Sequence, residues 1–209
     1  MTITVWSDIR CPFCYIAKRK LENAISQFSH KEEVKVEWKS FELDPNLQTN
    51  TSINTIDYYV SKGAGKQQMI DLFSNATKMA KEVGITFNLN DIVVANSFNA
   101  HKLVHVAKTI NKQNEAKELL LKAYFTDGKN IDDINVLLNI GTSLGFEIVD
   151  LANKLKDKAL DISIREDQKQ AKEVGVSGVP FFVFNNKEAI SGAQSEEVFL
   201  EVIKKTYQE

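Results

Sequence analysis

The stretch "SDIRCPFCYIAK", residues 7–18, contains both cysteines of this 209-residue chain, three positions apart. It follows "TITVW" at residues 2–6, whose alternation of polar and apolar side chains predicts a strand. From Pro12 onward apolar residues recur every three or four positions, as on one face of a helix, and proline is typical of a first helical turn. The sequence therefore predicts a strand, a short loop and a helix, with the two thiols where the helix begins.

Composition narrows the class of protein. Hydrophobic residues make up 43% and charged residues 26% of the chain, which is typical of a soluble globular protein. A net charge of −2 provides no general attraction to nucleic acid or to an anionic membrane, and no apolar run is long enough to span a bilayer. The first residues, "MTITVWSD", lack the charged and apolar regions of a signal peptide. We therefore expect a cytoplasmic protein with neither nucleic acid nor membrane as a partner.

A C-x-x-C pair in a reducing compartment indicates redox chemistry or metal binding, because structural disulfides are rare there. Zinc is the metal to consider, and a closed zinc site needs four ligands. The chain has three histidines, His30, His101 and His105, and the last two have the i, i+4 spacing of helical ligands. A pair of histidines on a helix, however, is usually a surface or packing feature. We therefore predict redox use of the cysteines and no metal site.

The expected position of Cys11 indicates how it could react. At the N-cap of a helix its sulfur can receive backbone N–H groups and the positive end of the helix dipole. Such surroundings lower a thiol pKa from about 8.5 to roughly 3.5–7.5. Cys14 lies on the apolar, inward stripe of the same helix. We therefore expect Cys11 to be the nucleophile and Cys14 the buried, resolving thiol.

The rest of the chain divides into a long helical stretch with β segments on either side. The alternating run at residues 34–38 predicts a second strand, and residues 181–184 and 188–191 predict a hairpin before a final helix that begins near Ser195. Between them, residues 53–174 are expected to be helical almost throughout. Apolar stripes predict the helices within it, at residues 69–83, 98–110, 116–125, 134–144, 148–155 and 157–174.

The segment "GVSGVPFFVF", residues 175–184, places a proline at the start of a buried strand. Proline cannot donate a hydrogen bond to a sheet, so this position is unusual unless the strand begins there. A cis Val179–Pro180 bond would remove the difficulty and would turn the Val179 backbone outward, where an extended substrate beside Cys11 could pair with it. The alternative is a trans proline in a loop.

With these residues placed, the chain resembles the DsbA-like branch of the thioredoxin superfamily, in particular its FrnE-type subgroup. The matching segments are "SDIRCPFCYIAKRKLE", "FELDP", "NSFNAHKLVHVAK", "AYFTDGKNIDD" and "VGVSGVPFFVFNNKEAISGAQ". The resemblance implies an α/β protein: a thioredoxin fold built from residues 1–52 and 175–209, with a large all-helical domain inserted at 53–174. It also implies a thiol–disulfide oxidoreductase or isomerase in which Cys11 attacks, Cys14 resolves and a cis Pro180 loop binds substrate.

Substrate contacts are expected from Pro12, Phe13, Val179 and Pro180. Phe13 stands where relatives often have Trp, which should alter substrate packing and leave the chemistry intact. Asp8 also recurs in the family, where it could assist proton transfer at Cys14 or simply cap the loop. The expected substrates are protein or small-molecule disulfides and thiols. No cofactor is expected beyond glutathione as a co-substrate, and the chain is expected to be a monomer or a homodimer.

Two other functions remain open on the sequence. The same branch contains kappa-class glutathione transferases and 2-hydroxychromene-2-carboxylate isomerases, which bind glutathione at the equivalent cleft and typically have Ser in place of Cys11. The paired thiols argue against that activity, because an activated glutathione needs no resolving cysteine. A binding protein or holdase without redox turnover is the other alternative.

Overall fold

The computed structural model describes residues 1–208. The chain forms two compact units: the first comprises Met1–Leu43 and the chain from Ile162 onward, and the second is Asp44–Asp161. Both boundaries lie earlier than the expected divisions at 52/53 and 174/175. The physical reason is long-range bonding: the Leu47 carbonyl oxygen accepts a hydrogen bond from Asn96 in the second unit, whereas Asp167 bonds to the sheet of the first.

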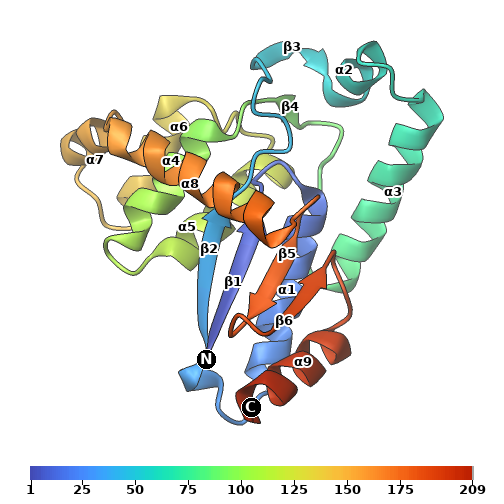
Figure 1. Cartoon of the computed structure of the whole chain (residues 1–209). Helices are drawn as coiled ribbons and strands as arrows, with labels where there is room; N and C mark the ends of the chain where they lie inside the picture. The colour runs from blue at the N-terminus through green and yellow to red at the C-terminus, as the bar shows by residue number, and fades with distance from the viewer. Residues whose placement is uncertain (209) are drawn as a thin grey trace. The chain divides into compact units, whose positions relative to one another are not determined.

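The first unit is built on a four-stranded sheet in the order β2-β1-β5-β6 (Figure 1). Its strands are β1 (Thr2–Ser7), β2 (Lys35–Ser40), β5 (Phe181–Phe184) and β6 (Glu188–Ser191). β1 and β2 are parallel and are joined through α1 (Pro12–Ser26) and the short 3-10 helix η1 (Lys31–Glu33), whereas β5 is antiparallel to both β1 and β6. This strand–helix–strand and hairpin arrangement is the expected thioredoxin fold.

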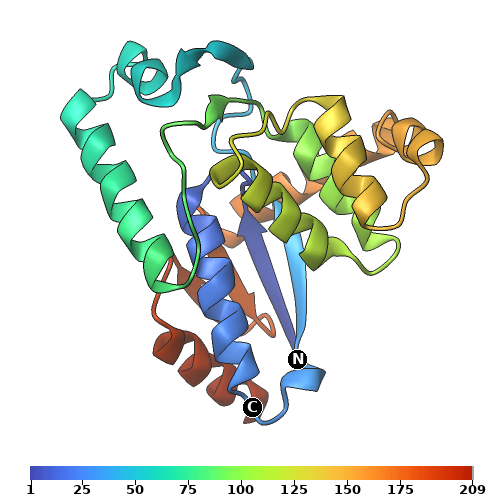
Figure 2. The ribbon, with the colours of Figure 1, turned by 180° about the vertical axis from the view of Figure 1, so that it is seen from behind.

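One face of the sheet is apolar and covered. Ile3 and Val5 of β1 point to this face, and in the sheet register Val5 lies opposite Phe182 of β5. All three side chains are completely buried. α1 lies over this face (Figure 2), and α9 (Glu196–Gln208) packs against α1 and places Phe199 edge-on to Phe182 at 4.8 Å between ring centroids.

The opposite face is largely polar, because alternate strand residues point to it. Thr2 and Thr4 of β1 lie here, and Thr4 stands opposite Glu37 of β2. Helix α8 (Lys158–Val174) crosses this face at the end where β1 and β2 finish (Figure 1). Close to that crossing β1 carries Trp6, which is buried.

The second unit is mainly helical, as expected. It contains α2 (Thr55–Ser61), α3 (Lys66–Glu82), α4 (Phe98–Lys108), α5 (Gln113–Phe125), α6 (Ile134–Ser143) and α7 (Ile148–Lys154). Its core includes Leu103, Leu120 and Phe125. Gly141 is needed where α6 meets α7, since a Cβ there would lie 2.0 Å from a methyl carbon of Leu151.

The insertion is not all-helical, which corrects one expectation. β3 (Asn50–Asn54) pairs antiparallel with β4 (Val93–Val94), and the Thr55 hydroxyl that follows β3 donates to the Ile92 carbonyl oxygen at 2.8 Å. A two-residue strand is too short to show an alternating pattern, so it left no signal in the sequence.

Candidate active site

The two cysteines lie in the turn that connects β1 to α1. Cys11 is the N-cap residue of α1, with extended backbone angles, and Pro12 occupies the first turn. The Cys11 N–H donates to the Asp8 carbonyl oxygen at 3.3 Å, and the Cys14 N–H donates to the Cys11 carbonyl oxygen at 3.0 Å. Both cysteines are free thiols and both are buried. The expected strand, loop and helix around the C-x-x-C pair are therefore confirmed.

A second segment, distant in sequence, lies beside Cys11. The Cys11 sulfur is 3.5 Å from the carbonyl oxygen of Val179 and donates its S–H to it. The Val179–Pro180 peptide bond is cis, and β5 begins at the next residue, Phe181. The Val179 carbonyl was expected to face outward and await a substrate, but here it accepts a hydrogen bond from the thiol. Pro12 and Phe13, the two residues between the cysteines, are partly exposed.

The environment of Cys11 raises its pKa well above the ordinary value, which contradicts the lowering expected from a helix N-cap. The largest cause is the hydrogen bond with the Cys14 side chain, followed by burial and by negative charge at Cys14; the Asp8 carboxylate adds to the same direction. The Cys14 N–H acts in the opposite direction. Its effect is smaller than that of the side-chain hydrogen bond or of burial, so the raising causes outweigh it. A neutral Cys11 thiol is therefore favoured in this arrangement.

Asp8 holds the cysteine loop in place. It is completely buried, and its two carboxylate oxygens accept backbone N–H groups from Arg10 at 3.1 Å and from Leu43 at 2.8 Å. These bonds tie the loop before Cys11 to the segment that follows β2. Of the two roles considered from the sequence, the observed contacts are those of the cap.

Two residues that the sequence analysis did not single out lie next to this site. The Trp6 indole N–H donates to the carbonyl oxygen of Asp167 at 2.9 Å, a contact between residues 161 positions apart. The Asp167 carboxylate accepts the Ser40 N–H at 2.9 Å and pairs with the Lys39 ammonium at 3.1 Å. In the sequence, Trp6 is one more apolar residue of a strand and Asp167 is one of many charged residues on a helix. No local pattern therefore distinguishes them.

The histidines considered as metal ligands do not gather with other ligands. His101 is buried within α4, and His30 lies in the first unit, stacked on Tyr207 with 4.8 Å between ring centroids. Within residues 1–208 there is no group of three or more His, Cys, Asp or Glu side chains with the geometry to hold a metal ion.

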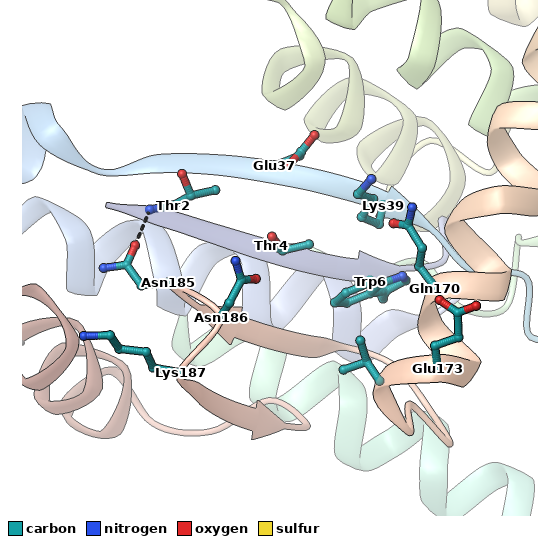
Figure 3. A pocket seen from close by; sticks show the side chains of 11 residues that line it. Thr2, Thr4, Trp6, Glu37, Lys39, Gln170, Glu173, Asn185, Asn186 and Lys187 are labelled. Carbon is teal, nitrogen blue, oxygen red and sulfur yellow. Dashed lines mark hydrogen bonds between the residues drawn. The ribbon is translucent and has the colours of Figure 1, made fainter.

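The polar face of the sheet carries a separate cavity of about 840 Å³ (Figure 3). Thr2, Thr4 and Trp6 of β1 form its floor, with Glu37 and Lys39 of β2 beside them. Gln170 and Glu173 of α8 and the β5–β6 turn complete the lining. Neither cysteine is among the lining residues, so this cavity is distinct from the C-x-x-C site.

Comparisons with known proteins agree with this architecture. The family model of the DSBA-like thioredoxin domain matches residues 2–204. The Bacillus subtilis (strain 168) protein YwbO is 28% identical over 203 residues, which is 96% of this chain and 94% of that protein. A crystal structure of a probable DsbA oxidoreductase from Streptomyces coelicolor, also 28% identical, has a TM-score of 0.91 and covers 100% of this chain and 91% of its own.

A more distant structure shares the fold alone. The cytosolic disulfide reductase DsbM from Pseudomonas aeruginosa has a TM-score of 0.72 at 15% identity, with 100% of this chain and 99% of that chain covered. Within the described part of this chain, no helix combines the length and the apolar character that crossing a membrane requires. The family model spans nearly the whole chain, from the strand before the cysteines to the last helix. The chain therefore belongs to the family of DSBA-like thioredoxin domains.

Proposed function

We propose that this protein is a thiol–disulfide oxidoreductase or isomerase that exchanges disulfides through Cys11 and Cys14. The observation that carries this proposal is the meeting of three elements: two free thiols at the start of α1, and the Val179 carbonyl 3.5 Å from the Cys11 sulfur. A backbone carbonyl beside a thiol can instead accept a hydrogen bond from the main chain of an extended substrate. The substrate disulfide then lies next to that sulfur.

The reduction of a substrate disulfide would take two steps. Cys11 gives its proton to solvent, its thiolate attacks one substrate sulfur, and the substrate S–S bond breaks as the Cys11–substrate bond forms. Cys14 then loses its proton and attacks the Cys11 sulfur, which releases the second substrate thiol and leaves a Cys11–Cys14 disulfide. Two electrons pass to the substrate, whose two sulfurs take up two protons. Cys14 suits the resolving role because it lies on the inward face of α1 with a side chain 1% exposed.

The environment of Cys11 favours reduction of substrates over their oxidation. A strongly oxidising C-x-x-C protein stabilises its dithiol form as a thiolate, as DsbA does with a thiol pKa near 3.5. Here the pKa of Cys11 is raised, first by the hydrogen bond with Cys14 and then by burial, so the dithiol form gains no such stabilisation. We propose that reduced glutathione, or another small thiol, returns the Cys11–Cys14 disulfide to the dithiol.

Three further properties belong to the same proposal: the location, the co-substrate and the substrate contacts. A cytoplasmic location suits a reductase, and the structural relative DsbM is described as cytosolic. That relative has also been solved with GSH, which supports glutathione as the first co-substrate to test. Pro12, Phe13, Val179 and Pro180 are proposed as the substrate contacts, since the first two lie between the cysteines and the Val179 carbonyl lies 3.5 Å from the Cys11 sulfur.

The test is a redox titration in glutathione buffers, with the state of the thiols read by alkylation and mass spectrometry. We expect one cooperative two-electron transition, with a potential closer to that of thioredoxin, about −270 mV, than to that of DsbA, about −120 mV. A Cys14→Ser variant should accumulate a mixed disulfide between Cys11 and glutathione, because it lacks the second of the chain's two cysteines, which would otherwise resolve that bond within the protein.

Other results would point to the alternatives. Glutathione-dependent transferase or isomerase activity that survives Cys14→Ser would indicate the kappa-class type of reaction. A holdase would show two results together. The wild-type protein would form no Cys11–Cys14 disulfide at any glutathione ratio, and the Cys11→Ala variant would still bind unfolded peptides. This pair of results would rule out the proposal.

A further inference from the structure

Trp6 is an exception on the polar face of the sheet. The two other residues that β1 directs to this face are Thr2, which is exposed, and Thr4, which is partly exposed, whereas the Trp6 side chain is 4% exposed. It lies five residues before Cys11, at the end of β1 where α8 crosses the sheet (Figure 3). Strand alternation predicts a half-solvated residue at this position, so the burial of a large ring here requires a reason.

A hydrogen bond fixes the orientation of the indole ring. Its N–H donates to the Asp167 carbonyl oxygen at 2.9 Å in a buried setting. Asp167 is itself held to β2 through the Ser40 N–H, at 2.9 Å, and the Lys39 ammonium, at 3.1 Å. The ring of Trp6 is therefore anchored to a residue that is bonded to β2 at two further points.

The indole ring supports the segment that contains Pro180. Trp6 forms a small core cluster with Ala171 and Val176, and Val179 and Phe181 pack against that cluster. The Phe181 ring meets the Trp6 ring edge-on, with 6.4 Å between centroids and 64° between the planes. The residues on both sides of Pro180 thus rest on one cluster, and Trp6 is its largest member.

One of those residues carries the acceptor of the Cys11 thiol, the Val179 carbonyl oxygen at 3.5 Å. We propose that Trp6 is a positioning residue for disulfide exchange: it acts through Val179, holding that carbonyl group at the Cys11 sulfur and shaping the backbone on which an extended substrate would pair. This inference rests on the proposed function and adds a residue that does not itself touch the reacting atoms.

The cavity explains why a side chain smaller than Trp6 would not hold Val179 in the same position. Trp6 lines one end of the 840 Å³ space on the polar face, so that space lies directly beside the indole (Figure 3). With a smaller ring, the cluster could relax toward the cavity, because side chains in a loosened core move into the volume that is left. Val179 would then lose its fixed distance from the sulfur.

The test compares Trp6→Phe with Trp38→Phe. Trp38 is the other tryptophan of the chain, is 3% exposed, and pairs with Val5 on the covered face of the same sheet. Both variants remove an indole from the sheet, but Trp38 is not part of the cluster beneath Val179. For Trp6→Phe we expect KM for a peptide disulfide to rise about fivefold, as the loss of one net hydrogen bond would give, with kcat changed less than twofold. Trp38→Phe should leave both constants unchanged.

A second measurement does not require turnover. The Val179 carbonyl favours the protonated Cys11 thiol, so its displacement in Trp6→Phe should increase the rate of Cys11 alkylation at neutral pH several-fold. Val176→Ala, which trims the same cluster, should act in the same direction and serves if Trp6→Phe does not fold. Equal changes in the Trp6 and Trp38 variants, or none in either, would overturn the inference.

The two proposals fail in different ways. If the wild-type protein forms no Cys11–Cys14 disulfide, the proposed function is wrong, yet the alkylation rates still report whether Trp6 positions Val179. If the wild-type protein exchanges disulfides and Trp6→Phe leaves KM and the alkylation rate unchanged, the function stands and Trp6 is a packing residue.

Discussion

The two faces of the sheet in the first unit differ in what covers them. On one face, Ile3, Val5 and Phe182 are completely buried beneath α1 and α9. On the other, Thr2 and Thr4 line an open cavity, and burial begins only near α8, at Trp6. The covered face is apolar, whereas the region beneath α8 buries polar groups such as Asp167 together with aromatic ones.

This difference suggests that the covered face mainly stabilises the fold, whereas the contacts near α8 mainly fix the positions of individual groups. Apolar side chains that interdigitate contribute most to the free energy of unfolding, and one hydrophobic residue can substitute for another of similar size. A buried carboxylate or indole N–H is different, because its partners must stand at defined distances or remain unsatisfied. The cysteine loop follows the strand end where such polar contacts converge, which suits a site that requires exact geometry more than it requires hydrophobic burial.

The largest expected effect tests the covered face through two neighbours on β5. Phe182→Ala removes a fully buried ring that packs on Phe199, and should cost about 3–5 kcal/mol of unfolding free energy. Phe181→Ala, on the opposite face, should cost roughly 1–2 kcal/mol, because part of its ring is already in water. Urea unfolding measures both. Equal losses of unfolding free energy in the two variants would mean that the two faces of the sheet contribute equally to stability.

An intermediate effect tests whether the Asp167 carboxylate holds α8 on the sheet. Asp167→Ala leaves the Ser40 N–H and the Lys39 ammonium without their acceptor, and should cost about 2–3 kcal/mol. Asp167→Asn keeps an oxygen acceptor and should cost about 1 kcal/mol. Glu173→Ala on the same helix is the control, since its carboxylate is exposed, and should change stability by less than about 0.5 kcal/mol. If the Asp167 variants behave like this control in urea unfolding, the carboxylate does not hold α8 on the sheet.

The smallest expected effect concerns pH at the cysteine end of the sheet. The pKa of Cys11 is raised in the folded protein, first by the hydrogen bond with Cys14, so the neutral thiol stabilises the fold. This contribution is fully present below the pKa of an unfolded thiol, about 8.5, and is lost as pH rises through the higher folded value. The reduced protein should therefore lose stability in urea between about pH 8.5 and the folded pKa of Cys11.

Two variants isolate the source of that loss. Cys11→Ser should flatten the pH dependence, and Asp8→Asn should make the total loss smaller and end it at a lower pH, because the Asp8 charge adds to the raised folded pKa of Cys11. Glu32→Gln, in the exposed segment before β2 at the far end of the strands, should leave it unchanged. An alkaline loss as large in Cys11→Ser as in the wild type would show that other groups cause it.

Much of the fold follows from local patterns. The alternating runs at β1 and β2, the proline after Cys11 and the apolar stripes of α4 to α8 predicted elements that the structure confirms within a few residues. The sequence did not predict the pairing of β3 with β4 or the boundaries between the two units. Short strands and long-range hydrogen bonds produce no periodic pattern in a sequence.

The sequence by itself determined where the thiols stand: at the start of a helix, one of them on its inward face, with a proline-led strand elsewhere in the chain. The tertiary structure alone decided what surrounds them. The Val179 carbonyl reaches Cys11 across 168 positions of sequence, and Asp167 reaches Trp6 across 161. The direction of the Cys11 pKa depends on burial and on neighbouring charges, which are properties of the folded packing, so a helix start could predict a lowered value where the assembled site raises it.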